Sequence, residues 1–478
     1  MAHNNSGNAR HRDGKNEEAV AEYRTSVALD PRSAVTHYNL GNVLYDQGRL
    51  TEAADEYQAA IQFDQKDSAA HSNLGNVFSD EGKLDEAIRE YRAATALDPR
   101  NAVTHYNLGN VLRDQDNLEA AETEYRTASQ FEPKDAAGYF NLGNVLVAQK
   151  NLAGALKYYH DGLAIAPRLA QSDPTNAGWQ RDLAASDENV GDILVAKSDL
   201  AGALKFYRDG LAIRERLARS EPGNAAWQRD LAVSDQKVGD VLVSQGDLAG
   251  ALKFYRDGRT IIARLAQSKP GNTGRQRDLA VSDQKVGDVL VSQGDLAGAL
   301  TSYQASLAIA EHLVQSDPSN AGWQRDLSVA HDRIGDVQQA QGDLAAALAS
   351  YQASLAIAER LAKADPGNAG WQRDLSVSHE RIGDVQQAQG DLAAAVASYQ
   401  ASLAIAERLA KADPGNAGWQ HDRIVSYVKL AGVDRKASRS FLTRALETAQ
   451  QMQRRGQLAP SDLWMLDDLT KRIAALAK

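Results

Sequence analysis

The sequence predicts an all-α protein, a solenoid of antiparallel helix pairs stacked along one axis. Three observations favour this fold. Glycines recur with a 34-residue and then a 48-residue period along most of the chain, and apolar residues within each repeat step by three or four. Only 11 of the 478 residues are prolines, and the composition is rich in residues that favour helix. A chain of this length exceeds one hydrophobic core, so a repeat array accounts for its size.

The glycines define two kinds of repeat. The short repeats carry Gly41, Gly75, Gly109 and Gly143 at a 34-residue period, and Gly7 extends the series backwards. The long repeats carry Gly191, Gly239, Gly287, Gly335 and Gly383 at a 48-residue period, and each of these glycines is followed by aspartate. Tryptophan keeps the longer period at Trp179, Trp227, Trp323, Trp371 and Trp419, and Arg275 stands where one more would fall.

Both periods describe one helical hairpin. Counted from the glycine, an alanine stands at position +12 and a tyrosine at position +16, as in Ala53 and Tyr57 or Ala251 and Tyr255. Small residues allow the two helix backbones to approach closely, and we expect the tyrosine to fill the space between neighbouring hairpins. Proline then ends the short repeats, since it cannot continue a helix.

This pattern resembles the tetratricopeptide repeat family over roughly residues 5–450. The 34-residue units are similar to the repeats of O-linked N-acetylglucosamine transferases, and the 48-residue units to the longer repeats of kinesin light chains. The resemblance implies a right-handed superhelix with a concave groove. Neither a transferase nor a motor-associated domain accompanies the repeats, so the resemblance extends to the architecture alone.

The apolar pattern of residues 319–366 places the 14 extra residues of the long repeats. The first helix gains about two turns at its start and the second about two turns at its end. The resulting domains are a degenerate first repeat (1–33), an array of 34-residue units with its junction unit (34–174), five long units (175–414), a degenerate last repeat (415–458) and a C-terminal capping helix (459–478).

Irregular segments interrupt the pattern. Pro167 falls inside the lengthened second helix of the junction unit, so we expect a kink or break there. The first helix of the first repeat lacks an apolar face. The last helix, predicted over residues 461–477, begins with Ser461 and Asp462 as candidate caps and carries an apolar face. These apolar residues are Leu463, Trp464, Leu466, Leu469, Ile473 and Leu476.

The charge distribution excludes some classes of ligand. The net charge is −10, and residues 1–150 hold 15 Lys and Arg against 24 Asp and Glu. An acidic N-terminal third argues against nucleic acid as a partner, because phosphate binding requires a basic surface. The chain has no cysteine, no apolar run near its start and no apolar segment long enough to span a bilayer. We therefore expect a cytoplasmic protein that does not enter membranes.

The sequence suggests no catalytic residue, metal site or cofactor. It lacks nucleophile-elbow, zinc-protease and nucleotide-binding motifs. Five of its histidines occupy one repeat position, four residues before the glycine: His37, His71, His105, His331 and His379. Equivalent positions on stacked helices lie too far apart to converge on one ion, so half-buried structural histidines are expected. We predict that the protein is not an enzyme.

Repeated polar residues on the first helices are the candidate binding site. In the short repeats, asparagines three residues apart share one face. They are Asn39 and Asn42, Asn73 and Asn76, Asn107 and Asn110, and Asn141 and Asn144. A carboxamide donates and accepts at once, which suits the main chain of an extended peptide. The resemblance implies the same role, because related superhelical repeats hold peptide main chain on such a ladder. The alternative is that these amides link neighbouring repeats.

In the long repeats the same face carries charges. The pairs are Lys237 and Asp240, Lys285 and Asp288, Arg333 and Asp336, and Arg381 and Asp384, with Asn189 and Asp192 as a transition. Opposite charges three residues apart are expected to form exposed intrahelical ion pairs. The alternative is a charge-striped groove for a charged partner.

The leading hypothesis is a non-catalytic scaffold that binds an extended peptide or a partner domain in its concave groove. One alternative is a solenoid that self-assembles as a homo-oligomer or filament through its uncapped N-terminal end. Another is a regulatory or sensor subunit whose effector lies on a different protein.

Overall fold

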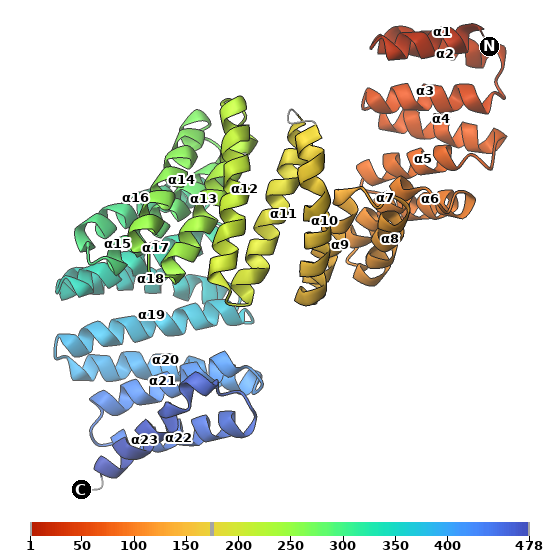
Figure 1. The fold of residues 1–478 in the computed structure, drawn as a ribbon. Helices are drawn as coiled ribbons and strands as arrows, with labels where there is room; N and C mark the ends of the chain where they lie inside the picture. Colours follow the sequence, from red (N-terminus) through yellow and green to blue (C-terminus); the bar gives the residue numbers. More distant parts are fainter. Residues whose placement is uncertain (1, 173–175, 477–478) are drawn as a thin grey trace. The chain divides into compact units, whose positions relative to one another are not determined.

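The computed structural model describes residues 2–172 and 176–476, and for residues 168–172 it describes the backbone alone. All elements in this part of the chain are helices, in consecutive antiparallel pairs. The helices fall into two compact units, residues 1–221 and 222–478. Figure 1 shows the pairs in chain order within each unit.

The N-terminal unit holds six hairpins. Their first helices are α1 (Ala2–Arg12), α3 (Ala34–Asp46), α5 (Ser68–Asp80), α7 (Ala102–Asp114), α9 (Ala136–Ala148) and α11 (Ala177–Ala196). Their second helices are α2 (Asn16–Leu29), α4 (Leu50–Phe63), α6 (Leu84–Leu97), α8 (Leu118–Phe131), α10 (Leu152–Ser172) and α12 (Leu200–Ser220). Each second helix packs on its own first helix and on the first helix that follows it within the unit.

The C-terminal unit holds five hairpins and a closing segment. Its first helices are α13 (Ala225–Ser244), α15 (Thr273–Ser292), α17 (Ala321–Ala340), α19 (Ala369–Ala388) and α21 (Ala417–Val433). Its second helices are α14 (Leu248–Ser268), α16 (Leu296–Ser316), α18 (Leu344–Ala364), α20 (Leu392–Ala412) and α22 (Ser438–Arg454). A short 3₁₀ helix, η1 (Pro460–Asp462), precedes the last helix, α23 (Trp464–Ala475).

The structure confirms where the long repeats gain their length. Helix α3 has 13 residues and begins seven before Gly41, whereas α13 has 20 residues and begins fourteen before Gly239. Helices α4 and α14 both begin nine residues after their glycines but have 14 and 21 residues. Each extension is therefore seven residues, about two turns.

The caps follow the local sequence. In the long hairpins the asparagine just before the first helix caps it, as where the Asn368 side chain accepts from the backbone N–H of Trp371 at 3.2 Å. The aspartate after the hairpin turn caps the second helix, as where Asp343 accepts from the N–H of Ala346 at 3.0 Å. Both residue types are strong N-caps because their side chains satisfy free helix N–H groups.

The core of each hairpin is built on one contact between its two helices. The ring of Tyr57 lies over Gly41, and a Cβ at that glycine would come within 2.8 Å of the ring. Tyr57 is 1% exposed and Ala53, one turn before it, is fully buried. The ring of Tyr57 packs inside its own hairpin, and Tyr57 also belongs to a buried cluster that includes Leu74 and Val77 of the next hairpin.

Two irregular segments differ from expectation, the one around Pro167 and the start of the last helix. Helix α10 continues through Pro167 as far as Ser172, so the break expected at this proline does not occur. The last helix begins at Trp464, and in η1 and α23 neither Ser461 nor Asp462 caps it. Of its apolar face, Leu469 is buried whereas Trp464 is 62% exposed. Residue 477 lies outside the described residues.

Candidate functional site

The predicted asparagines lie on the first helices of the N-terminal unit. These helices contact one another in succession, α1 with α3, α3 with α5 and α5 with α7. All of the predicted asparagines are half-buried except Asn144, which is exposed. The structure therefore brings the eight asparagines together as one continuous row, which we call the asparagine ladder.

Hydrogen bonds between consecutive hairpins join this row. Asn73 Nδ2 donates to Asn42 Oδ1 at 2.9 Å, and Asn107 Nδ2 donates to Asn76 Oδ1 at 3.0 Å. The same bond joins Asn141 to Asn110 at 3.4 Å, and Asn39 donates to Asn4 at 3.1 Å in the first helix. The alternative that these amides link neighbouring repeats is therefore realised in the structure.

A tyrosine hydroxyl also donates to the second asparagine of each pair. Tyr57 donates to Asn42 Oδ1 at 2.8 Å and Tyr125 donates to Asn110 Oδ1 at 2.7 Å. Burial raises the pKa of Tyr57 and of Tyr125 far above the usual value, so both hydroxyls remain donors at any ordinary pH. The repeat pattern predicted these tyrosines as packing residues but did not predict the hydrogen bonds that their hydroxyls donate.

Half of each carboxamide is used inside the protein. The second asparagine of a pair accepts two hydrogen bonds at Oδ1, and the first asparagine donates from Nδ2. Among the described residues, no hydrogen bond within the protein engages Nδ2 of Asn76 or Oδ1 of Asn73 and Asn107. The repeat that contains α5 thus presents one amide donor and one carbonyl acceptor on the same face, and the next repeat continues the row with a second acceptor.

The charged pairs of the long repeats occupy the equivalent positions. Lys285 Nζ lies 2.6 Å from Asp240 Oδ1, and Lys429 Nζ lies 2.6 Å from Asp384 Oδ1. Arg333 lies 3.5 Å from Asp288, and Arg381 donates to Asp336. The expectation of intrahelical pairs was wrong for Lys285, Arg333 and Arg381, because each one reaches the aspartate of the preceding hairpin.

The two ladders share one geometry. In the short repeats the asparagine–asparagine hydrogen bond joins residues 31 apart, and in the long repeats the ion pair joins residues 45 apart. Each separation is three residues fewer than the repeat length. Tyr303 donates to Asp288 at 2.6 Å, as Tyr57 does to Asn42. Burial, followed by the Asp288 hydrogen bond, raises the pKa of Tyr303. Aspartate therefore replaces the second asparagine, and lysine or arginine replaces the first.

A second row of ion pairs in the C-terminal unit was missed by sequence analysis. It joins Arg229 to Asp278, Arg277 to Asp326, Arg325 to Asp374 and Arg373 to Asp422, at 2.9, 2.5, 2.7 and 2.6 Å. The signal was present, because the sequence Gln-Arg-Asp-Leu recurs in the long repeats. It was overlooked because the partners lie 49 residues apart.

The histidines of the short repeats have structural partners. His37 Nδ1 lies 2.6 Å from Glu56 on the second helix of the same hairpin, and His105 lies 2.6 Å from Glu124. Their Nε2 atoms lie 3.1 Å from the carbonyl oxygens of Pro31 and Pro99. Among the described residues, no three acidic or histidine side chains are grouped as metal ligands.

The first helix also makes polar contacts with its neighbours. His3 and His11 of α1 contact Glu22 and Asp46, both at 2.7 Å. Gly7 is the buried residue of α1, under the ring of Tyr23.

Within residues 2–172 and 176–476, no helix is long and apolar enough to cross a membrane.

Stacked hairpins with a recurring geometry between neighbours define a helical-repeat protein. Residues 7–48, 41–81, 75–115 and 109–150 match the family described as "TPR repeat", and residues 139–173 match "Tetratricopeptide repeat". Residues 7–173 therefore carry tetratricopeptide repeats.

Solved structures of similar proteins were found at low identity. The crystal structure of MamA is 22% identical, covers 34% of this chain and 96% of its own, and has a TM-score of 0.34. That of YrrB, "a TPR protein with an unusual peptide-binding site", is 20% identical over 42% of this chain and 93% of its own, with a TM-score of 0.34. PilF of Pseudomonas aeruginosa is 20% identical over 48% and 94%, with a TM-score of 0.37. No curated protein matches the chain.

Proposed function

We propose that the protein is a non-catalytic scaffold and that its N-terminal unit binds an extended peptide along the asparagine ladder. The observation that carries the proposal is the pair of unused polar groups at Asn73 and Asn76, which Asn107 continues into the next repeat. Main-chain peptide groups offer one donor and one acceptor per residue, and the ladder presents the complementary groups. In each asparagine, the half of the carboxamide that is hydrogen-bonded within the protein fixes the orientation of the other half before the peptide binds.

The shape of the surface supports the same proposal. Between α5 and α7 the ladder borders a depression of about 290 Å³, lined by Asn76, Asn107 and Asn110 among other residues. A second depression, of about 250 Å³, includes Asn144 and Asn189 in its lining. Asn189 donates to Asn144 at 3.2 Å, so the ladder extends into the first long hairpin.

The charged ladder of the long repeats is proposed as a structural element rather than a second peptide groove. Its aspartates accept from tyrosine and from the following lysine or arginine, so each charge is matched inside the protein. A peptide main chain would have to displace an ion pair to reach these groups. We therefore place peptide binding in the short repeats.

The test uses a display library of random 12-residue peptides, selected on the full chain. Bound peptides are then titrated against the variant Asn73→Ala/Asn107→Ala by fluorescence anisotropy. This variant removes two outward acceptors and the donors of two hydrogen bonds between hairpins, but it leaves Tyr57 and Tyr91 their own hydrogen-bond acceptors. We expect the affinity to fall at least tenfold, since two hydrogen bonds to the peptide are lost.

The matched control is Gln58→Ala/Gln62→Ala, which removes two carboxamides from the exposed face of α4. It should leave the affinity unchanged. If every selected peptide binds the ladder variant and the wild-type protein equally well, the groove is not the binding site. Assembly through the N-terminal end remains a separate prediction, which sedimentation over a concentration range can test.

A further inference from the structure

We infer that the depression between α5 and α7 is a subsite for a lysine or arginine side chain of the bound peptide. This inference rests on the proposed function, and it adds the class of peptide that the groove selects. The depression is lined by the ladder residues Asn76, Asn107 and Asn110 and by four others, Tyr45, Ser79, Asp80 and Tyr91. Every lining side chain carries a hydroxyl, a carboxamide or a carboxylate, which disfavours an apolar anchor.

The one carboxylate in the lining, Asp80, gives the depression its charge. Asp46 and Asp80 occupy the same position of consecutive repeats, five residues after the glycine, and both are exposed. Asp46 contacts an imidazole nitrogen of His11 at 2.7 Å, and Asp80 accepts from the hydroxyl of Tyr45 at 2.6 Å. Neither contact is with lysine or arginine, so no permanent positive charge is paired with them.

The nearby cations are engaged elsewhere. Arg49 donates to Glu52 at 2.6 Å, Lys83 lies 2.8 Å from Glu81 and Arg113 lies 2.9 Å from Asp114. Within the described residues Asp80 therefore has no lysine or arginine partner. An acidic or neutral peptide side chain would gain nothing there, whereas an ammonium or guanidinium group would form charge-assisted hydrogen bonds.

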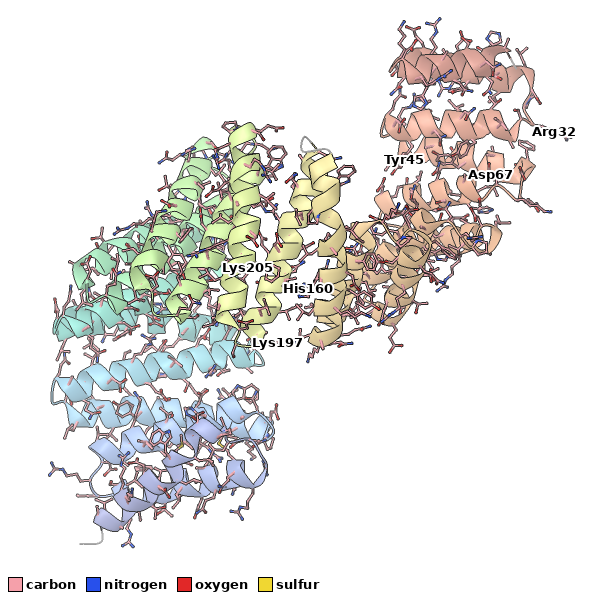
Figure 2. The ribbon with its side chains drawn as sticks, viewed as in Figure 1. Arg32, Tyr45, Asp67, His160, Lys197 and Lys205 are labelled. Atoms are coloured by element: carbon pink, nitrogen blue, oxygen red, sulfur yellow. The ribbon has the colours of Figure 1, made fainter. Side chains whose placement is uncertain are left out.

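Tyr45 fixes the charge of the subsite. Burial raises the pKa of Tyr45 to about 12, and the hydrogen bond and charge of Asp80 add to this effect. The tyrosine therefore stays protonated and donates to Asp80, which keeps one carboxylate oxygen for a ligand. Figure 2 shows Tyr45 at the opposite end of these hairpins from Arg32 and Asp67, which lie in the connections between hairpins.

The carboxylate is confined to the short repeats. The equivalent position holds Asp46, Asp80 and Asp114 in α3, α5 and α7. It holds Ala148 and Ala196 in α9 and α11, and Ser244, Ser292, Ala340 and Ala388 in the C-terminal unit. We therefore expect a basic peptide side chain to bind only along the part of the asparagine ladder between α3 and α7.

The same random 12-residue library tests the inference. Peptides whose binding depends on Asn73 and Asn107 should be enriched in lysine or arginine relative to the unselected library. Asp80→Asn should weaken their binding about tenfold, the scale of one hydrogen bond to a charged group. Replacing the critical peptide lysine with glutamine should have a similar effect on the wild-type protein and little further effect on Asp80→Asn.

The control variant is Asp55→Asn, which makes the same charge change on the exposed face of α4 and should bind as wild type. Ladder-dependent peptides that are neutral or acidic, or that bind Asp80→Asn with undiminished affinity, would overturn the subsite and leave the proposed function intact. A selection that yields no ladder-dependent peptide would overturn both.

Discussion

The hydroxyl of Tyr91 donates a 2.6 Å hydrogen bond to Oδ1 of Asn76, and Asn107 of the next hairpin donates to the same oxygen at 3.0 Å. One acceptor atom therefore joins the two helices of a hairpin and joins that hairpin to the next. The ring of Tyr91 also covers Gly75. Packing within the repeat and coupling between repeats thus depend on the same few residues.

Tyr91→Ala should lower the free energy of unfolding by about 3–5 kcal/mol, the range for truncating a large buried aromatic residue. Tyr91 is 1% exposed, so almost the whole side chain is lost from the core. Tyr91→Phe keeps the ring and removes the hydroxyl, and it should cost about 1 kcal/mol. Chemical denaturation measures both. A loss below about 1 kcal/mol for the alanine variant would contradict this role in the core.

Gly75→Ala should destabilise the protein by about 1–3 kcal/mol, because overpacking forces neighbouring groups apart. A Cβ at this position would meet the Tyr91 ring at 2.7 Å. Helix propensity alone predicts the opposite sign, a gain of about 1 kcal/mol. Gly432→Ala is the matched control, since it lies in α21 with no atom near its Cβ position and should not destabilise. Equal effects of the two substitutions would show that the tyrosine ring can move aside.

Lys285→Ala should cost less than about 1 kcal/mol, and a salt concentration of about 1 M should abolish most of the difference from wild type. The reason is that Lys285 and Asp240 are both more than one-third exposed. Asp240→Ala should cost more, because it also removes the acceptor of the buried hydroxyl of Tyr255. Denaturation at low and high salt separates the two effects. An equal cost for both variants would mean that Tyr255 finds another acceptor.

Asp187 should make stability depend on pH. Burial, followed by the charges of Asp209 and Glu188, raises the pKa of Asp187 from 3.8 to about 7. A raised folded-state pKa means that the native state holds the proton more tightly than the unfolded state. The stabilisation is complete below about pH 4 and is lost as the pH rises toward 7.

Asp187→Asn imitates the protonated form at every pH. Its free energy of unfolding relative to wild type should therefore increase between pH 4 and pH 8, by on the order of 1–4 kcal/mol. The comparison cancels the opposite contributions of His331 and His379, whose pKa values are lowered by burial. Asp55→Asn on an exposed face should show no such trend. A constant difference between Asp187→Asn and wild type would rule out the raised pKa.

The repeat architecture could be predicted from the sequence because its signals are local and recur. The glycine and tyrosine spacing located the hairpins, and the three- and four-residue steps of apolar side chains predicted both helices and the seven-residue extensions. The residues that line the ladder could also be named, since asparagines three apart on a helix must share a face. The hairpin positions, the helix lengths and the shared face of the asparagines all depend on residues that are close together in the sequence.

Pairing between hairpins could not be predicted in the same way. Lys285 lies three residues from Asp288 in the sequence but binds Asp240, 45 residues earlier. Which carboxylate it reaches depends on the offset between stacked hairpins, and that offset follows from the packing of whole helices. The sequence alone determined the repeat, its period and its polar face. Only the tertiary structure decided which polar groups satisfy one another and which remain free to bind a partner, because that depends on distances between segments that the chain does not connect directly.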